Sequence, residues 1–210
     1  MGLFSSSKPA AAKTTNKVWK TPQACLKGIV MESLRSIKNG EVPVIITFFN
    51  EAHGKLISFL DSSSVPYQLV EAFSGKDIWQ QKAIIAVADA FASGGFVNNI
   101  PPEMKVSFFF LGRYPLLSTE NAWVGNLAVR FPNAGISFCL SMEDPLFESF
   151  GSNSLKPLME KLGMADDECI EHTMVNKALH NALEKIGQKV TTDMKANSER
   201  DWFARNAPIT

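Results

Sequence analysis

The chain has 210 residues and a mass of 23.1 kDa, which suits one compact domain or a domain with an appendage. Its 21 Lys and Arg residues balance its 21 Asp and Glu residues, so the formal net charge is zero. Because phosphate backbones and anionic lipids are bound by an excess of basic residues, this balance argues against nucleic acid and against a charged membrane surface as partners. Three scattered cysteines and no apolar run of about 18 residues predict a cytoplasmic protein without disulfides or stable membrane insertion.

The first 20 residues are rich in Ser, Lys, Ala and Thr, and we expect 1–20 to be a disordered tail. A first helix is predicted to begin at Thr21-Pro22, an N-cap residue followed by proline, and to end at Asn39-Gly40. Beyond it, short apolar runs alternate with segments of helical periodicity. Strands are expected at 44–49, 67–70, 106–111 and 136–141, and helices at 50–60, 77–91 and 118–130. This alternation predicts a parallel sheet with flanking helices, so 21–150 is expected to be one α/β domain.

From Asp144 onward the pattern is helical only, and 151–210 is expected to be an all-helical extension. Helices are predicted at 156–162, at 175–190 and at 198–206. The second of these carries an apolar stripe that must pack either on the α/β core, the commoner outcome, or on a partner. Trp202 and Phe203 are aromatic anchors of the same kind. The candidate interaction residues are therefore Val175, Leu179, Leu183, Ile186, Trp202 and Phe203.

Common catalytic motifs are absent from the sequence: it contains no P-loop, no G-x-G-x-x-G and no G-x-S-x-G. Cys169 and His172 are three residues apart, but a catalytic dyad also needs an orienting third group, and none is evident. The three histidines lack the spacing of metal ligands. The acidic pair Glu143-Asp144 lies at a predicted helix start, where it complements the helix dipole. We therefore expect no metal and no catalytic residue.

An ordered series of short motifs in the C-terminal third points to a known family. Residues 138–146 read F-C-L-S-M-E-D-P-L and resemble the F-x-L-S-[ML]-E-D-x-L segment of the SecA family, the preprotein translocase ATPases. F-G-S at 150–152, L-G-M at 162–164 and I-E-H-x-x-V-x-K-A at 170–178 follow in the family's order. Fainter matches at Pro43-Val44 and Val65-Pro66-Tyr67 extend the resemblance to about 43–190. It implies that the α/β domain is RecA-like, as in the second nucleotide-binding domain of the family, and that the chain then enters the helical scaffold.

The same resemblance shows where this chain departs from the family. A Gly- and Arg-rich motif that meets the ATP phosphates should precede residue 138, but by an ungapped count its three arginines fall on Val124, Asn126 and Val129. Gly125 is kept and Arg130 lies one position out of register, so these two are the candidates for residual nucleotide binding. The family's A-G-R-G-T-D loop has no counterpart near 93–96. We therefore expect no cofactor.

Two functional hypotheses follow from the resemblance. The first is a non-enzymatic SecA-like interaction module with a P-loop NTPase fold, which binds a protein partner and is accessory to protein export. The alternative is an ATP-binding half-domain, or NTPase subunit, that is completed by another chain.

Overall fold

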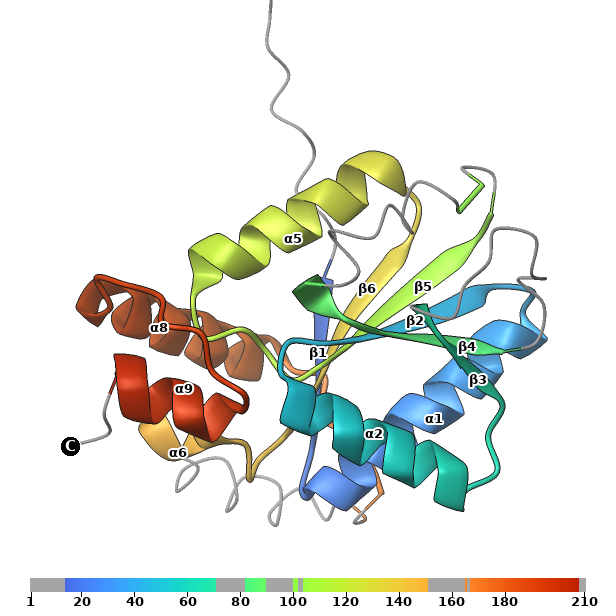
Figure 1. Cartoon of the computed structure of the whole chain (residues 1–210), viewed down its shortest axis with the longest axis horizontal. Helices are drawn as coiled ribbons and strands as arrows, with labels where there is room; N and C mark the ends of the chain where they lie inside the picture. Colours follow the sequence, from blue (N-terminus) through green and yellow to red (C-terminus); the bar gives the residue numbers. More distant parts are fainter. Residues whose placement is uncertain are drawn as a thin grey trace, which may run out of the picture.

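The computed structural model describes residues 14–70, 82–89, 100–101, 104–150, 165 and 167–207. Within them, six parallel strands form one sheet in the order β1-β6-β5-β2-β4-β3 (Figure 1). The strands are Thr14–Trp19 (β1), Val42–Thr47 (β2), Tyr67–Leu69 (β3), Ala83–Val87 (β4), Val106–Leu111 (β5) and Gly135–Ser141 (β6). The helices are Pro22–Lys38 (α1), Asn50–Ser62 (α2), Leu117–Arg130 (α5), Pro145–Phe150 (α6), Thr173–Lys189 (α8) and Glu199–Asn206 (α9). The predicted RecA-like α/β class is confirmed.

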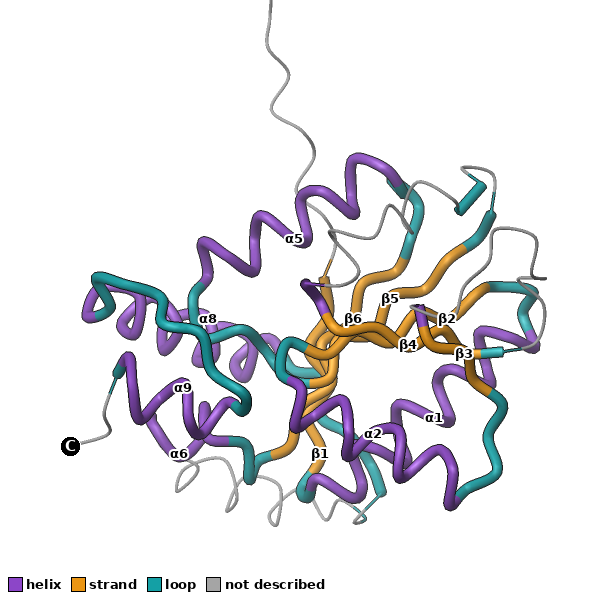
Figure 2. The backbone as a smooth tube through the Cα atoms, in the orientation of Figure 1, coloured by secondary structure: helices purple, strands orange, loops and turns teal. Residues whose placement is uncertain are grey.

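Helices cover both faces of the sheet, and each face has its own hydrophobic core (Figure 2). On one face, α1 and α2 pack against Ile45 and Ile85. On the other face, α5, α8 and α9 pack against Val44, Ile46 and Phe110. Successive side chains of β2 therefore enter opposite cores, which explains why this central strand is apolar at nearly every position.

The first strand lies where the sequence analysis expects a disordered tail. Thr14–Trp19 pairs in parallel with β6, from Thr14 opposite Ile136 to Trp19 opposite Ser141. The prediction is wrong for these residues because an edge strand needs few apolar anchors: here Val18 enters one core and Trp19 the other. Residues 1–13 lie outside the described part of the chain.

The fourth strand lies within a predicted helix. We expect a helix at 77–91, but Ala83–Val87 forms β4, which pairs with β2 on one side and β3 on the other. The prediction is wrong for these residues because a short continuous apolar run fits a strand buried on both faces as well as a buried helix. Residues 71–81 and 90–91 lie outside the described residues.

The described helices beyond residue 150 pack on the α/β core. The apolar stripe of α8 joins the same cluster as α5 and the sheet, and an isolated antiparallel bridge joins Val18 of β1 to Ile170 just before α8. The α9 segment begins at Ser198, whose side chain accepts a hydrogen bond from the backbone N–H of Asp201. The predicted helix at 156–162 lies outside the described residues.

A close contact between α1 and β1 makes Gly28 sensitive to substitution. A Cβ atom at Gly28 would lie 2.3 Å from Cζ2 of Trp19, whose ring is buried. We expect Gly28→Ala to lower the free energy of unfolding by about 1–3 kcal/mol, because the indole or the helix must shift. Urea denaturation followed by circular dichroism measures the change.

Gly54 in α2 provides the matched control. It is also a helical glycine, but a Cβ atom there would meet nothing within 4 Å. Gly54→Ala is expected to raise the free energy of unfolding by about 0.5–1 kcal/mol, because alanine favours the helix. Equal effects of the two substitutions would contradict the steric argument.

Candidate functional site

The topology of the sheet marks one place on its carboxyl edge where a ligand can enter. The neighbouring strands β2 and β5 lead into α2 and α5, and these two helices lie on opposite faces of the sheet. The loops that follow β2 and β5 therefore leave the ends of adjacent strands toward opposite faces of the sheet. In open α/β sheets such a topological switch point is where ligands bind.

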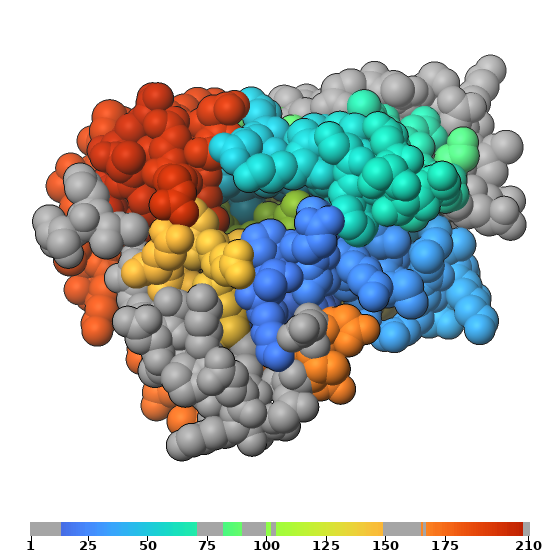
Figure 3. All heavy atoms as spheres, turned by 90° about the horizontal axis from the view of Figure 1, so that it is seen from below, coloured from blue at the N-terminus to red at the C-terminus, as the bar shows by residue number. Residues whose placement is uncertain are grey.

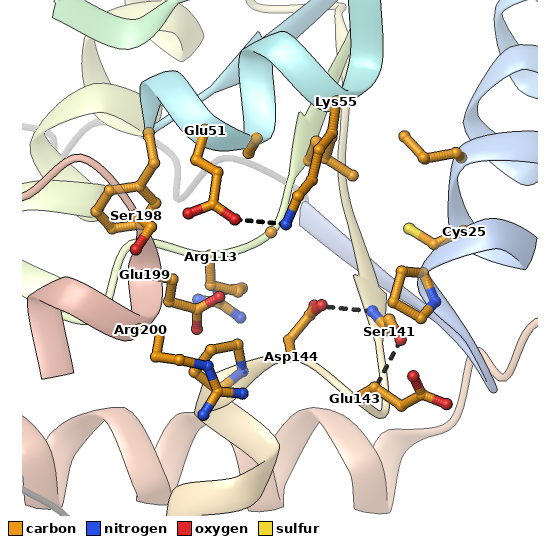
Figure 4. Close-up of a pocket in the computed structure, with 17 residues that line it drawn as sticks. Cys25, Glu51, Lys55, Arg113, Ser141, Glu143, Asp144, Ser198, Glu199 and Arg200 are labelled. Atoms are coloured by element: carbon orange, nitrogen blue, oxygen red, sulfur yellow. Dashed lines mark hydrogen bonds and ion pairs between the residues drawn. The ribbon is translucent and has the colours of Figure 1, made fainter. Parts of the chain in front are cut away.

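A cavity of ≈ 230 Å³ lies at this point, which we call the switch-point cavity (Figure 4). Figure 3 shows the molecule hollowed between α1, α2, α6 and α9. The polar lining comes from the segments that follow β2, β5 and β6 and from the start of α9: Glu51, Lys55, Arg113, Ser141, Glu143, Asp144, Ser198, Glu199 and Arg200. Apolar lining comes mainly from the start of α1, at Pro22, Cys25 and Leu26, and from Phe49 and Ala52.

The charges in the cavity do not favour an anionic ligand. Four carboxylates and three cationic side chains are among the described residues that line it. Each of the three cations already has a carboxylate partner in this chain, in the pairs Lys55–Glu51, Arg113–Glu120 and Arg200–Glu148. A polyphosphate in the cavity would therefore face four carboxylates that repel it, and three cations that it would have to share with carboxylate partners.

The Arg113–Glu120 pair lies at the buried end of this site. Glu120 is 1% exposed and accepts hydrogen bonds from the guanidinium of Arg113 and from the backbone N–H of Tyr114. Arg113 also donates to Oδ1 of Asn16 at 2.8 Å and lies over the ring of Phe138. Because all these groups are held by one another, Arg113 acts as a structural link between β1, β6 and α5.

Asp144 immediately precedes α6, and its carboxylate accepts the backbone N–H of Ser141 at 2.8 Å (Figure 4). Burial of the carboxyl group raises the pKa of Asp144 to about 7, and the negative charge of Glu143 adds to this effect. The Ser141 hydrogen bond and the charge of Lys55 act in the opposite direction. The position at a helix start is as the sequence analysis interprets it, but the carboxyl group also faces the cavity.

Glu199 reaches the same place from the first turn of α9. Its Oε1 accepts the backbone N–H of Leu146, in the first turn of α6, at 3.0 Å. Burial, followed by the charge of Asp144, raises the pKa of Glu199 well above its usual value. Both side chains are half-buried and line the same cavity, so a negative charge on Asp144 makes Glu199 harder to ionise.

The candidates for residual nucleotide binding do not line this cavity. Gly125 is exposed on α5. Arg130, at the end of the same helix, donates to the carbonyl of Ile100 at 3.3 Å and lies 5.7 Å from the ring centroid of Phe131. The helix thus holds both residues outside the switch-point cavity. Residues 93–96 are not among the described residues.

The six candidate interaction residues are buried in the core of this chain. They are Val175, Leu179, Leu183, Ile186, Trp202 and Phe203, and none is more than 8% exposed. Packing on the α/β core, the first of the two alternatives for the stripe, is what the structure shows. A surface for a partner would need other side chains.

The surroundings of His172 and Cys169, the remaining candidates, favour structural roles. His172 is the N-cap of α8, and its Nδ1 accepts the backbone N–H of Met174 at 3.2 Å. Burial raises the pKa of the Cys169 thiol, which disfavours a thiolate nucleophile. The described part of the chain holds no group of three or more His, Cys, Asp or Glu that could bind a metal. Among its helices, none is both long and apolar enough to cross a membrane.

Sequence reasoning missed Arg113 and Glu199, and it missed the cavity role of Asp144. Arg113 follows the predicted strand at 106–111 by two residues, so a search for polar groups after strand ends could have found it. Glu199 lies 53 residues from its partner Leu146, and no local pattern links the two.

A parallel sheet with helices on both faces and a cavity at its switch point defines a RecA-like α/β protein. No protein-family model matches the sequence. The protein translocase subunit SecA of Clostridium kluyveri is 31% identical over 183 residues, which are 80% of this chain and 22% of that relative. SecA of Campylobacter curvus is 28% identical over 180 residues, with 80% of this chain and 21% of the relative covered. SecA of Phocaeicola vulgatus is 26% identical over 199 residues, with 88% and 18% covered.

The chain therefore belongs to a SecA-related family. It spans about a fifth of the length of the curated relatives that it matches.

Proposed function

We propose that the chain is a non-enzymatic SecA-like interaction module that serves protein export in the cytoplasm by binding a protein partner. The observation that carries the proposal is the similarity to protein translocase subunits SecA over four fifths of the chain. The proposed role in export comes from the names of those relatives. The module would use the packing of the family's α/β fold without its phosphoryl-transfer chemistry.

The electrostatics of the switch-point cavity support the non-enzymatic part of the proposal. Phosphoryl transfer needs positioned Lys and Arg side chains and Mg²⁺ to stabilise the charge on the phosphates. Lys55, Arg113 and Arg200 each form an ion pair with a carboxylate of the same chain. The candidates Gly125 and Arg130 lie outside the cavity on α5. To receive a triphosphate, each of these three cations would have to share or give up its carboxylate partner.

The position of the cavity favours a second candidate function, an ATP-binding half-domain completed by another chain. Nucleotides bind at topological switch points of open α/β sheets, and this is where the cavity lies. A second chain would then have to supply the missing phosphate-binding groups.

Calorimetric titration distinguishes the two functions. We expect no binding heat for ATP or ADP with the chain alone, and none in addition to that of SecA when full-length SecA is present. Nucleotide binding that appears only when both proteins are mixed would support the half-domain instead. Micromolar binding of ATP by the chain alone would contradict both the charge argument and the proposed function.

The export role is tested in cells of the source organism. Deleting the gene is expected to make precursors of secreted proteins accumulate, as measured by pulse-chase labelling. An affinity-tagged copy that restores export should co-purify with a component of the export machinery. Unchanged precursor processing, together with no export component in the purified complex, would overturn the proposal.

A further inference from the structure

The switch-point cavity has more carboxylates than cations to pair with them. Its lining holds four carboxylates and three cations, and two of these cations, Arg113 and Arg200, pair with carboxylates from outside the lining. The third, Lys55, pairs with Glu51. Three carboxylates of the lining therefore have no ion-pair partner within the described residues: Glu143, Asp144 and Glu199. The cavity thus carries an excess of negative charge.

Asp144 and Glu199 each offer one carboxylate oxygen to a ligand. Oδ2 of Asp144 accepts the backbone N–H of Ser141 at 2.8 Å, and Oε1 of Glu199 accepts that of Leu146 at 3.0 Å. The second oxygen of each carboxylate accepts no hydrogen bond from the described residues. The two N–H bonds hold the side chains in place and favour their ionised forms. Both carboxylates are therefore positioned to accept a further donor.

A cation in the cavity would relieve the cost of keeping these groups charged. Burial, followed by the charge of a neighbouring carboxylate, raises the pKa of both Asp144 and Glu199. A bound cation offsets both causes, because it supplies the counter-charge that the described residues lack. Lys55 acts on Asp144, and Arg200 on Glu199, only through their charge, since each of these cations forms its ion pair elsewhere.

The other side of the cavity is apolar and suits an alkyl chain. The start of α1 contributes Pro22, Cys25 and Leu26, and the start of α2 contributes Phe49 and Ala52. The hollow is open at the surface between α1, α2, α6 and α9, so a side chain of another protein can enter it (Figure 3). An apolar wall beside unpaired carboxylates matches a side chain with an alkyl stem and a cationic head.

We propose that the switch-point cavity is a socket for a basic side chain, Lys or Arg, of the protein partner. The alkyl stem lies along the start of α1, and the cationic head faces the open oxygens of Asp144 and Glu199 (Figure 4). The socket rests on the proposed function, since it states the chemistry by which the chain recognises its partner. The charges select this occupant, because an anion would be repelled and a neutral chain would leave the carboxylates without a counter-charge.

Titration of the 15N-labelled chain with Nα-acetyl-lysinamide, followed by amide chemical shifts, tests the socket. We expect saturable shifts at the backbone amides of Ser141 and Leu146, which donate to the two carboxylates. Nα-acetyl-norleucinamide has nearly the same stem without the charge, and it should bind at least about tenfold more weakly. Equal affinities for the two probes, or no saturable shift at the cavity, would overturn the proposal. This comparison uses the wild-type chain, so it stands even where a substitution prevents folding.

Two substitutions remove the charges but keep the oxygen acceptors. In Asp144→Asn and Glu199→Gln an amide oxygen can still accept the N–H of Ser141 or Leu146. Each should weaken the binding of Nα-acetyl-lysinamide about fivefold or more, because half of the unpaired charge that faces the ligand is lost. Glu184→Gln, on the exposed side of α8, should bind the probe as the wild type does. Wild-type affinity in both cavity variants would overturn the proposal.

Co-purification separates the socket from the proposed function. The affinity-tagged wild type should retain a component of the export machinery, and the double variant Asp144→Asn with Glu199→Gln should lose it. Retention of that component by the folded double variant would overturn the socket while the proposed function stands. Specific binding of Nα-acetyl-lysinamide by a chain that retains no export component would support the socket and contradict the proposed function.

Discussion

Replacing Glu120 with alanine is expected to lower the free energy of unfolding by about 3–5 kcal/mol. Glu120 is the sole ion-pair partner of Arg113 among the described residues, and both side chains are buried. Nε of Arg113 donates to Glu120 at 2.8 Å, and the backbone N–H of Tyr114 donates to it at 3.2 Å. Without the carboxylate, the guanidinium charge stays buried with only Asn16 and the Phe138 ring beside it. Urea denaturation measures the loss.

The matched control is an exposed pair. Lys55→Ala removes the pair with Glu51, whose side chains are 68% and 46% exposed, and should change the free energy of unfolding by less than about 1 kcal/mol. Glu120→Gln should cost less than Glu120→Ala, since an amide oxygen still accepts one hydrogen bond. The double variant Arg113→Met with Glu120→Leu should recover most of the loss, because it removes both charges from the interior. Similar losses for Glu120→Ala and Lys55→Ala would contradict the argument.

The parts of the fold that could be predicted are those specified by local sequence. The first helix begins where Thr21-Pro22 indicates, and Oγ1 of Thr21 accepts the N–H of Ala24. The four predicted strands lie within one or two residues of β2, β3, β5 and β6. Their apolar runs are long enough, and bounded clearly enough by turn residues, to be recognised without knowing their neighbours.

The strands β1 and β4 could not be predicted because their partners decide them. The five apolar residues Ala83–Val87 fit a helix or a strand by pattern alone. They form a strand because they pair with β2 on one side and with β3 on the other. Thr14–Trp19 has a polar composition, and it is ordered through pairing with β6, more than 120 residues away. Neither partner can be identified from the local pattern.

The same reasoning applies to the candidate site. The strand order that creates the switch point is a property of the whole sheet, so the sequence analysis had no reason to bring Lys55, Arg113 and Asp144 together. Glu199 joins them only because the chain returns across this edge of the sheet after α8. The sequence leaves open whether the apolar stripe of α8 packs on the core or on a partner, and the structure shows that the core covers it.

Replacing Trp202 with alanine is expected to lower the free energy of unfolding by about 3–5 kcal/mol and to release residues 190–207, the segment that follows α8. The indole is fully buried, and its ring packs edge-on against Tyr114 and Phe203. Trp202→Ala would leave a large cavity beneath α9 and would remove the hydrogen bond to Asp193. Urea denaturation gives the loss of stability, and hydrogen exchange of 190–207 shows whether this segment is released.

Two comparisons separate the contributions of Trp202. Trp202→Phe keeps an aromatic ring in the core and loses chiefly the Nε1 hydrogen bond. Its loss in free energy of unfolding should therefore be at least about 1–2 kcal/mol smaller than that of Trp202→Ala. Met194 lies in the same segment but is 46% exposed, so Met194→Ala should change the free energy of unfolding by less than about 1 kcal/mol. If Trp202→Ala were no more destabilising than Met194→Ala, the indole could not be the anchor.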